Sequence, residues 1–289
     1  MKTVLVTGGN GFIGGYVTDE LLARGYDVTV LDTRARPSSG VVVLGDIRDP
    51  VAVGEAVSHA DGVIHLAGLL GTAEMVAYPK PAVEVNILGA LNVFEAAATH
   101  DVPVVNIAIG SQGATNTYAI TKDTADQFGR MFVRYRGAAI TTVRAYDAYG
   151  PRQVPPAPFG PSRVRKIIPS FACRALSGLP IEVYGDGEQV IDLIHVADVA
   201  TVLADALEMT ARSGPVAEVI EAGSGRPVTV LGVAEHVLAE VGGGEITHLP
   251  MRPGESHGAI IVATEPYMAV RSLSVGLPGT IAYYRGLLA

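Results

Sequence analysis

The chain has 289 residues, 48% hydrophobic and 17% charged, a balance that excludes a disordered chain and a membrane-spanning one. With 21 basic against 29 acidic residues, its net charge of −8 gives no overall positive field to attract nucleic acid or anionic lipid. A single cysteine, Cys173, excludes an internal disulfide and favours a reducing compartment. We therefore expect a cytoplasmic globular protein without nucleic-acid or membrane partners.

From residue 3 to about 146, short β-branched runs alternate with longer helical patterns, which is typical of strand–helix units in a parallel sheet. Strands are expected at Thr3–Thr7, Asp27–Leu31, Val41–Leu44, Gly62–Leu66, Val104–Ile109 and Ile140–Arg144. Apolar residues recur every three or four positions between them, which predicts helices at Ile13–Arg24, Val51–Ser58, Pro81–Thr99 and Tyr118–Tyr135. The pattern indicates an α/β fold with a doubly wound parallel (Rossmann) sheet.

Five prolines between residues 151 and 161 interrupt regular structure and separate a second region from the first. That region is expected to form helices at Ile167–Leu179, Val196–Met209 and Val230–Val241, with strands at Ile181–Tyr184 and Val216–Glu221. We expect a Rossmann domain over residues 1–165 and a smaller mixed α/β C-terminal cap over residues 166–289. Some segments of the second range are expected to return to the Rossmann sheet.

A glycine-rich loop, Thr7-Gly8-Gly9-Asn10-Gly11-Phe12-Ile13-Gly14, lies where the first strand ends and the first helix begins. Glycines allow a sharp turn and close approach of a pyrophosphate, which the helix N-terminus then binds. Asp32 ends the second strand, where its carboxylate can accept both hydroxyls of an adenosine ribose. Together these features predict a dinucleotide site.

Asp32 favours NAD over NADP, because a 2′-phosphate about 4 Å from a carboxylate would be repelled by roughly 4 kcal/mol at intermediate dielectric. Arg34 and Arg36 would weaken this preference if they turned inward, but we expect them to be solvated loop charges. Asp46 follows the third strand, where it is either an acceptor for the adenine edge or a helix cap ahead of Pro50.

Tyr118 and Lys122 are four residues apart at the start of a predicted helix, so both project from one face. A tyrosine titrates near 10, and service as a base at neutral pH needs its pKa lowered by about 3 units. Lys122 and an oxidised nicotinamide ring would together favour the phenolate, making Tyr118 a proton acceptor from a substrate hydroxyl.

With these motifs the chain resembles the extended short-chain dehydrogenase/reductase family, and within it the NAD-dependent epimerase/dehydratase group that acts on nucleotide sugars. Further matching segments are Gly45–Ile47, His65–Gly68, Asn86–Asn92, Arg144, Tyr149–Arg152, Ile168–Pro169, Val183–Gln189, Asp192, His195 and Arg252–Glu255. The resemblance covers nearly the whole chain.

The resemblance implies a set of NAD contacts: Gly8, Gly11, Phe12, Ile13, Gly14, Asp32, Asp46, Ile47, Leu66, Ala67, Gly68 and Lys122. It also implies that the cap holds a nucleoside-diphosphate sugar through Asp147, Ile168, Tyr184 and Arg252. Arg252 is the expected phosphate clamp, because a planar guanidinium matches two phosphate oxygens. A homodimer built from the helices containing Asn92 and Tyr118 is implied as well.

Three features depart from the family pattern. Gly110 stands where a Ser or Thr usually bonds the reacting hydroxyl; Ser111, one residue later, is the catalytic candidate or a turn residue, with Thr117 in reserve. The segment between Ser111 and Tyr118 is short, which implies a more open wall. Asp147 replaces the usual asparagine and Ile191 an arginine, so that Arg163, Arg165 and Lys166 either compensate or form a solvated basic patch.

Epimerisation at C4 of a UDP- or dTDP-hexose fits these residues best, because Gln112 and Gly113 lack the carboxylate that dehydratases add at this point. The alternatives are an NAD(P)H-dependent nucleotide-sugar reductase or dehydrogenase, a dehydratase, and a non-catalytic NAD-binding protein. Glu74 and Tyr78 are either sugar contacts or surface residues. The seven histidines show no metal-ligand spacing, so no metal site is expected.

Overall fold

Seven parallel strands form the large sheet in the order β10-β6-β5-β4-β1-β2-β3, in a computed structural model that describes residues 1–36, 38–110 and 114–289. The strands are β1 (Thr3–Thr7), β2 (Asp27–Asp32), β3 (Val41–Leu44), β4 (Gly62–His65), β5 (Val104–Ile109), β6 (Ile140–Ala145) and β10 (Ile220–Ala222). The first six confirm the predicted strands to within one residue. The strand order reverses between β1 and β4, where doubly wound folds bind their ligands.

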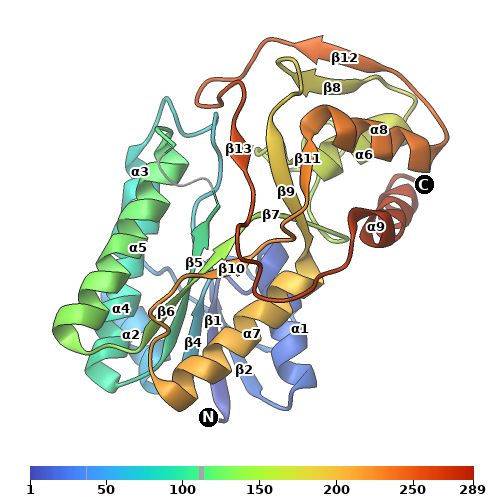
Figure 1. Ribbon diagram of the computed structural model, residues 1–289. Helices are drawn as coiled ribbons and strands as arrows, with labels where there is room; N and C mark the ends of the chain where they lie inside the picture. The colour runs from blue at the N-terminus through green and yellow to red at the C-terminus, as the bar shows by residue number, and fades with distance from the viewer. Residues whose placement is uncertain (37, 111–113) are drawn as a thin grey trace.

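Helices cover both faces of this sheet (Figure 1). One face packs against α1 (Phe12–Ala23) and α7 (Val196–Ser213), and the other against α2 (Pro50–Ser58), α4 (Ala90–His100) and α5 (Thr117–Arg136). Alternate residues of a strand serve the two cores, because successive side chains point to opposite faces. In β1, Val4 and Val6 belong to the first core and Leu5 to the second, and all three are fully buried.

The helix predicted over Pro81–Thr99 is present, but its middle is wound as a π-helix. It runs through α3 (Lys80–Ala82), the π segment η1 (Val83–Gly89) and α4. Asn86 lies inside η1 and is buried, with its side chain hydrogen-bonded to both backbone groups of Leu69 and to the hydroxyl of Thr121. The wide turn thus fixes the loop after β4 against α5, as π turns do at many functional sites.

The second region has its own core. Strands β7 (Asp147–Tyr149), β11 (Pro227–Thr229) and β13 (Ile260–Ile261) pair with β9 (Val190–His195), while β8 (Ile181–Tyr184) pairs with β12 (Ile246–Leu249). These strands pack against α6 (Ile167–Leu176), α8 (Val230–Val241) and α9 (Leu273–Leu288). In Figure 1, β8, β12, α6 and α8 lie above the large sheet.

The two regions interleave along the chain. After β9, α7 and β10 return to the large sheet, and the expected strand at Val216–Glu221 is observed as a shorter, later one at Ile220–Ala222. Asp192 of β9 is fully buried and accepts hydrogen bonds from the backbone of Ser224, Gly225 and Ala263. A buried carboxylate of this kind fixes the cap against the large sheet, because losing it would leave several donors without a partner.

Candidate active site

The loop between β1 and α1 has no room for side chains at two of its predicted glycines. Gly8 is left-handed (φ 71°), and a Cβ there would lie 2.8 Å from the backbone of Ala67. A Cβ on Gly14 would meet the Gly8 carbonyl and lie 2.6 Å from the Cα of Gly9. Gly11 is the N-cap residue of α1, and no side chain of the described residues forms a capping hydrogen bond there. The N–H groups of the first turn are therefore available to a pyrophosphate.

Asp32 lies at the end of β2 and is 6% exposed. Its carboxylate accepts hydrogen bonds from the backbone N–H of Asn10, in the glycine loop, and of Arg34. The carboxylate is therefore fixed beside the loop, where a ribose would lie. Arg34 and Arg36 are both exposed, as expected, and Arg34 Nε lies 3.4 Å from Asp32 Oδ1.

Asp46 is the part-exposed end of an ion pair with Arg48, whose hydrogen bonds hold the pKa of the carboxyl below its usual range. The helix-cap alternative for Asp46 is wrong, because Asp49 caps α2 by accepting from two backbone N–H groups. Ile47 is buried against Gly89, where a Cβ would lie 2.5 Å from its Cδ1. Both stand at the carboxyl edge of the sheet, after β3.

The segment Leu66–Gly68 continues β4 toward the glycine loop. Leu66 donates its N–H to the carbonyl of Thr7, and Ala67 to the Thr7 hydroxyl. A Cβ on Gly68 would lie 3.1 Å from the side-chain oxygen of Asn86. Close packing between the ends of β1 and β4 thus forms one wall of the candidate dinucleotide site. The asparagine of η1 behind this wall was not assigned a role from the sequence, although it opens one of the matching motifs.

Tyr118 and Lys122 lie in the first turns of α5, which Asn116 caps by accepting from the N–H of Ala119. Tyr118 is half-buried and Lys122 is 6% exposed. Burial lowers the pKa of Lys122 to about 8, and Asp126 opposes that shift. Lys122 also acts on His65, whose pKa is lowered to about 3 by burial and then by this cation. The ammonium group therefore acts electrostatically on the last residue of β4.

The surroundings of Tyr118 favour the neutral phenol. Burial raises its pKa first, and the nearby Asp147 carboxylate raises it further. A phenolate at neutral pH therefore needs additional positive charge at the site, as expected for a residue that works beside an oxidised nicotinamide.

Gly110 has no hydroxyl with which to form the Ser or Thr contact of the family, and the Thr117 hydroxyl has a backbone partner. A Cβ on Gly110 would lie 2.5 Å from the ring of Tyr146, so this position is filled by the residue that follows β6. The Thr117 hydroxyl donates to the carbonyl of Met75, in the loop after β4. Ser111, Gln112 and Gly113 lie outside the described residues.

Tyr118, Asp147, Ile168 and Arg252 line one cavity of about 130 Å³ beyond the carboxyl ends of β4 and β6. Glu74 lines it as well, so this residue belongs to the site, whereas Tyr78 is 78% exposed. The structure thus brings three of the four predicted substrate contacts to the predicted catalytic tyrosine.

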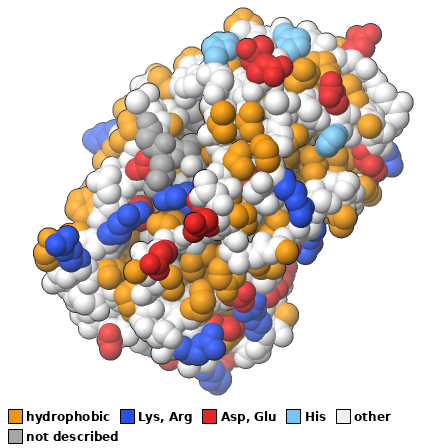
Figure 2. Space-filling view, in the orientation of Figure 1, with side chains coloured by type: hydrophobic (Ala, Val, Ile, Leu, Met, Phe, Trp, Pro, Cys, Tyr) orange, Lys and Arg blue, Asp and Glu red, His pale blue; other side chains and the backbone are white. Residues whose placement is uncertain are grey.

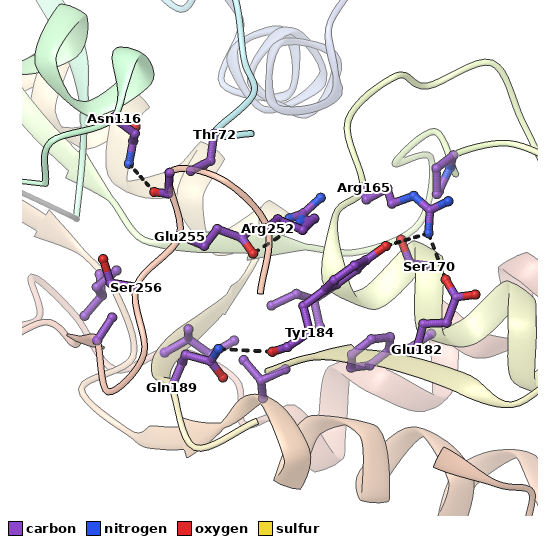
Figure 3. A pocket seen from close by; sticks show the side chains of 18 of the residues that line it. Thr72, Asn116, Arg165, Ser170, Glu182, Tyr184, Gln189, Arg252, Glu255 and Ser256 are labelled. Carbon is purple, nitrogen blue, oxygen red and sulfur yellow. Dashed lines mark hydrogen bonds and ion pairs between the residues drawn. The ribbon is translucent and has the colours of Figure 1, made fainter. Parts of the chain in front are cut away.

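A second cavity, of about 240 Å³, adjoins the first and contains the fourth predicted contact, Tyr184 (Figure 3). Arg165 donates to the Tyr184 hydroxyl and Arg252 lies over the Tyr184 ring, 4.9 Å from its centroid. The two cavities share five lining residues: Thr72, Arg165, Ile167, Arg252 and Glu255. A ligand with two linked parts can therefore occupy both.

The arginines of these cavities are paired with carboxylates, and the sequence did not reveal these pairings. Arg252 is bound by Glu255 and lies 3.6 Å from Glu74, which together raise its pKa against the effect of burial. Arg165 and Arg174 both pair with Glu182, at 2.8 and 2.9 Å. Glu255 is three residues after Arg252 in a matching segment, and this short spacing could have predicted their ion pair.

The surface around the cap mixes both signs of charge. On the face shown in Figure 2, acidic and basic side chains lie beside one another among apolar ones. None of the helices in the described ranges has the length and hydropathy needed to cross a bilayer. Within the same ranges, no group of three or more His, Cys, Asp or Glu side chains is placed to hold a metal ion.

Comparison with known proteins decides the family. The model of the NAD dependent epimerase/dehydratase family matches residues 4–223. The chain belongs to this family. As a member of the NAD-dependent epimerase/dehydratase family it uses the Rossmann fold and NAD, which confirms the predicted fold class and cofactor.

Relatives in this epimerase/dehydratase family carry more than one activity. The low-salt glycan biosynthesis protein Agl12 of Haloferax volcanii is 30% identical over 98% of both chains. The dTDP-glucose 4,6-dehydratase of Streptomyces niveus is 28% identical over 98% of this chain and 92% of its own. The UDP-glucose 4-epimerase of Thermus thermophilus, solved with NAD, has a TM-score of 0.84 at 28% identity, over 98% of this chain and 99% of that one. The reaction therefore has to be argued from the site.

The glycine positions fit the family cofactor and allow a direct test. Replacing Gly14 with Ala is expected to abolish NAD retention, because the added Cβ meets backbone of Gly8 and Gly9 that cannot move aside. The measurement is the NAD released on denaturing the purified variant. Gly54→Ala in α2 is the matched control, since a Cβ there has no heavy atom within 4 Å and NAD content should stay native.

Proposed function

We propose that this family member is an NAD-dependent nucleotide-sugar epimerase that inverts C4 of a UDP- or dTDP-hexose. The observation that carries the proposal is the shared cavity of Tyr118 and Arg252, which continues into the larger cavity beside Tyr184. A hexose in the smaller cavity would place a hydroxyl near the phenol, and the nucleoside diphosphate would extend into the larger one. Arg252, at the junction, is then the group that binds phosphate oxygens.

The chain's own residues would carry the proton transfers. The Tyr118 oxygen would accept the proton of the C4 hydroxyl as the C4–H bond breaks. It would return that proton after the keto sugar has rotated to present its opposite face. The glycine loop and Asp32 would hold NAD, which would supply a hydride acceptor and donor for C4. Lys122, four residues after Tyr118 on α5, would supply positive charge from the same helix face and so favour the phenolate.

Substrate binding requires Arg252 to exchange partners. Glu74 and Glu255 occupy its guanidinium, so a diphosphate binds by displacing at least one of them. Arg165, exposed at the edge of both cavities, is placed to add a second contact. A nucleotide sugar is favoured because its anionic part meets arginines while its sugar meets the phenol.

A 4,6-dehydratase is the second candidate, because Asp147 and Glu255 provide carboxyl groups in the same cavity as Tyr118. Elimination of water from the sugar needs such a second acid or base. Epimerisation needs no second acid or base, and it remains the better match because Gln112 and Gly113 offer no carboxylate after the Ser or Thr position. A reductase would consume NADH, and a non-catalytic NAD-binding protein would turn over nothing.

One experiment separates these reactions. The purified protein is expected to carry NAD, and incubation with UDP-glucose or dTDP-glucose without added cofactor should yield the 4-epimer. Proton NMR identifies the epimer, and mass spectrometry shows that its mass is unchanged. A product lighter by one water would establish the dehydratase instead, and turnover that requires added NADH would establish the reductase.

We also propose a cytoplasmic homodimer. The one cysteine, Cys173, is buried and free, which suits a reducing compartment. The surface that includes α4, α5 and the preceding π turn exposes Leu88 and Ile120 by 51% each and Tyr135 by 71%, and pairing with a second copy would cover such residues. Sedimentation velocity of the purified chain measures the dimer directly.

A further inference from the structure

Among the described residues, four carboxylates line the two cavities, and three of them are neutralised by arginine. Glu182 pairs with Arg165 and Arg174. Glu74 and Glu255 share Arg252, as described above. Their negative charge is therefore already balanced before any ligand enters.

Asp147 differs from these three. Within the described ranges, no hydrogen bond or ion pair joins its side chain to another residue, yet it lines the smaller cavity together with Tyr118. Burial raises its pKa, Asp192 behind it raises the pKa further, and Lys166 favours the ionised form. An unpaired acceptor beside the phenol is available for donors on a ligand.

The backbone holds Asp147 in this place. It is the first residue of β7, two positions beyond the end of β6, and β7 pairs in parallel with β9 so that Asp147 is in register with Leu193. The residue therefore stands where the chain passes from the large sheet to the cap sheet. This pairing fixes the backbone from which the Asp147 side chain extends.

We infer, resting on the proposed function, that Asp147 is a specificity-determining residue that admits neutral sugars beside Tyr118 and excludes sugars bearing a carboxylate. Hydroxyl groups of a neutral hexose would donate to it. The carboxylate of a uronic acid would instead face the like charge of Asp147, in a cavity where Lys166 already acts on Asp147 and where Arg252 would be occupied by the diphosphate. An asparagine at this position would impose no such penalty.

Binding to the NAD-loaded protein tests the inference without requiring turnover. Isothermal titration calorimetry compares UDP-glucose with UDP-glucuronate on the native protein and on Asp147→Asn. Native protein is expected to bind UDP-glucose at least about tenfold more tightly, and the variant to bind UDP-glucuronate about tenfold more tightly than native protein does, because like-charge repulsion is removed. Should Asp147→Asn fail to fold, Asp147→Ser removes the same charge.

Asp101→Asn is the matched control, because it removes one charge at an exposed helix end whose left-handed backbone (φ 54°) suits asparagine. It should keep the native preference. Equal binding of the two ligands to native protein, or a native preference in Asp147→Asn, would overturn the inference. Either result would leave the outcome of the epimerisation assay unchanged. Tight UDP-glucose binding without any product would overturn the proposed function, but it would not contradict the selectivity assigned to Asp147. Binding of neither ligand would overturn both.

Discussion

Replacing Tyr118 with Phe is expected to lower kcat for hexose interconversion by about 10²- to 10⁴-fold, the range typical of a lost general acid or base. The substitution removes one oxygen from the smaller cavity and keeps the ring that fills its wall. The glycine loop, Asp32 and the Asn116 cap of α5 do not depend on that oxygen. NAD content and thermal stability should therefore remain native while turnover, followed by NMR of the C4 epimer, is lost.

The matched control for this variant is Tyr135→Phe. Tyr135 is on the same helix but 71% exposed and far along it, so losing its hydroxyl should leave kcat native. If Tyr118→Phe turned over at the native rate, another group would have to be the base. The carboxyl of Asp147, which lines the same cavity and acts electrostatically on the phenol, would be the first to examine.

The large sheet was predictable because its signal is local. Each strand is a short apolar run buried on both faces, and each helix repeats apolar residues every three or four positions. The glycine loop follows the same logic, since the turn, the close contact with Ala67 and the free helix N-terminus all arise within one strand–helix unit. The role of Asp32 could be predicted as well, because the residue ends the next strand at the expected distance along the chain from that loop.

The cap was harder to predict because its strands are defined by distant partners. β13 has two residues and is a strand through its pairing with β9, about seventy residues earlier in the chain. β10 joins the large sheet through its ladder with β6, and buried carboxylates such as Asp192 hold the crossing segments in place. Nothing in the local sequence of these segments encodes those contacts.

The contrast between local and distant contacts also explains which parts of the site were predicted and which were missed. Tyr118 and Lys122 share a helix face, so their proximity follows from spacing. The neutralisation of Arg252 by Glu74 depends on packing the loop after β4 against a segment close to the C-terminal end, which no spacing reveals. Arg34 is exposed as expected, but its ion pair with Asp32 depends on the shape of the turn after β2.

Replacing Lys122 with Met is expected to lower kcat by about 10²- to 10³-fold, as for loss of one preorganised charged contact in an active site. Methionine fills a similar buried volume without the ammonium group, so the fold should persist. In the native enzyme, kcat should fall as the pH rises through about 8, the pKa of Lys122, because the lysine is a cation below that pH and neutral above it. The Lys122→Met variant should show no such fall.

Asp126 offers an independent check on which group causes kcat to fall at high pH, a fall that we call the basic limb of the pH profile. Its negative charge raises the pKa of Lys122, so Asp126→Asn should lower that pKa and move the limb to lower pH. Asparagine retains an oxygen to accept from Thr142, which limits the structural cost. Asp101→Asn, remote from the site, should leave the pH profile of kcat where it is in the native enzyme. A limb that stays at the same pH in Asp126→Asn would mean that a group other than Lys122 titrates there, and the charge that favours the Tyr118 phenolate would then have to be sought at the cofactor.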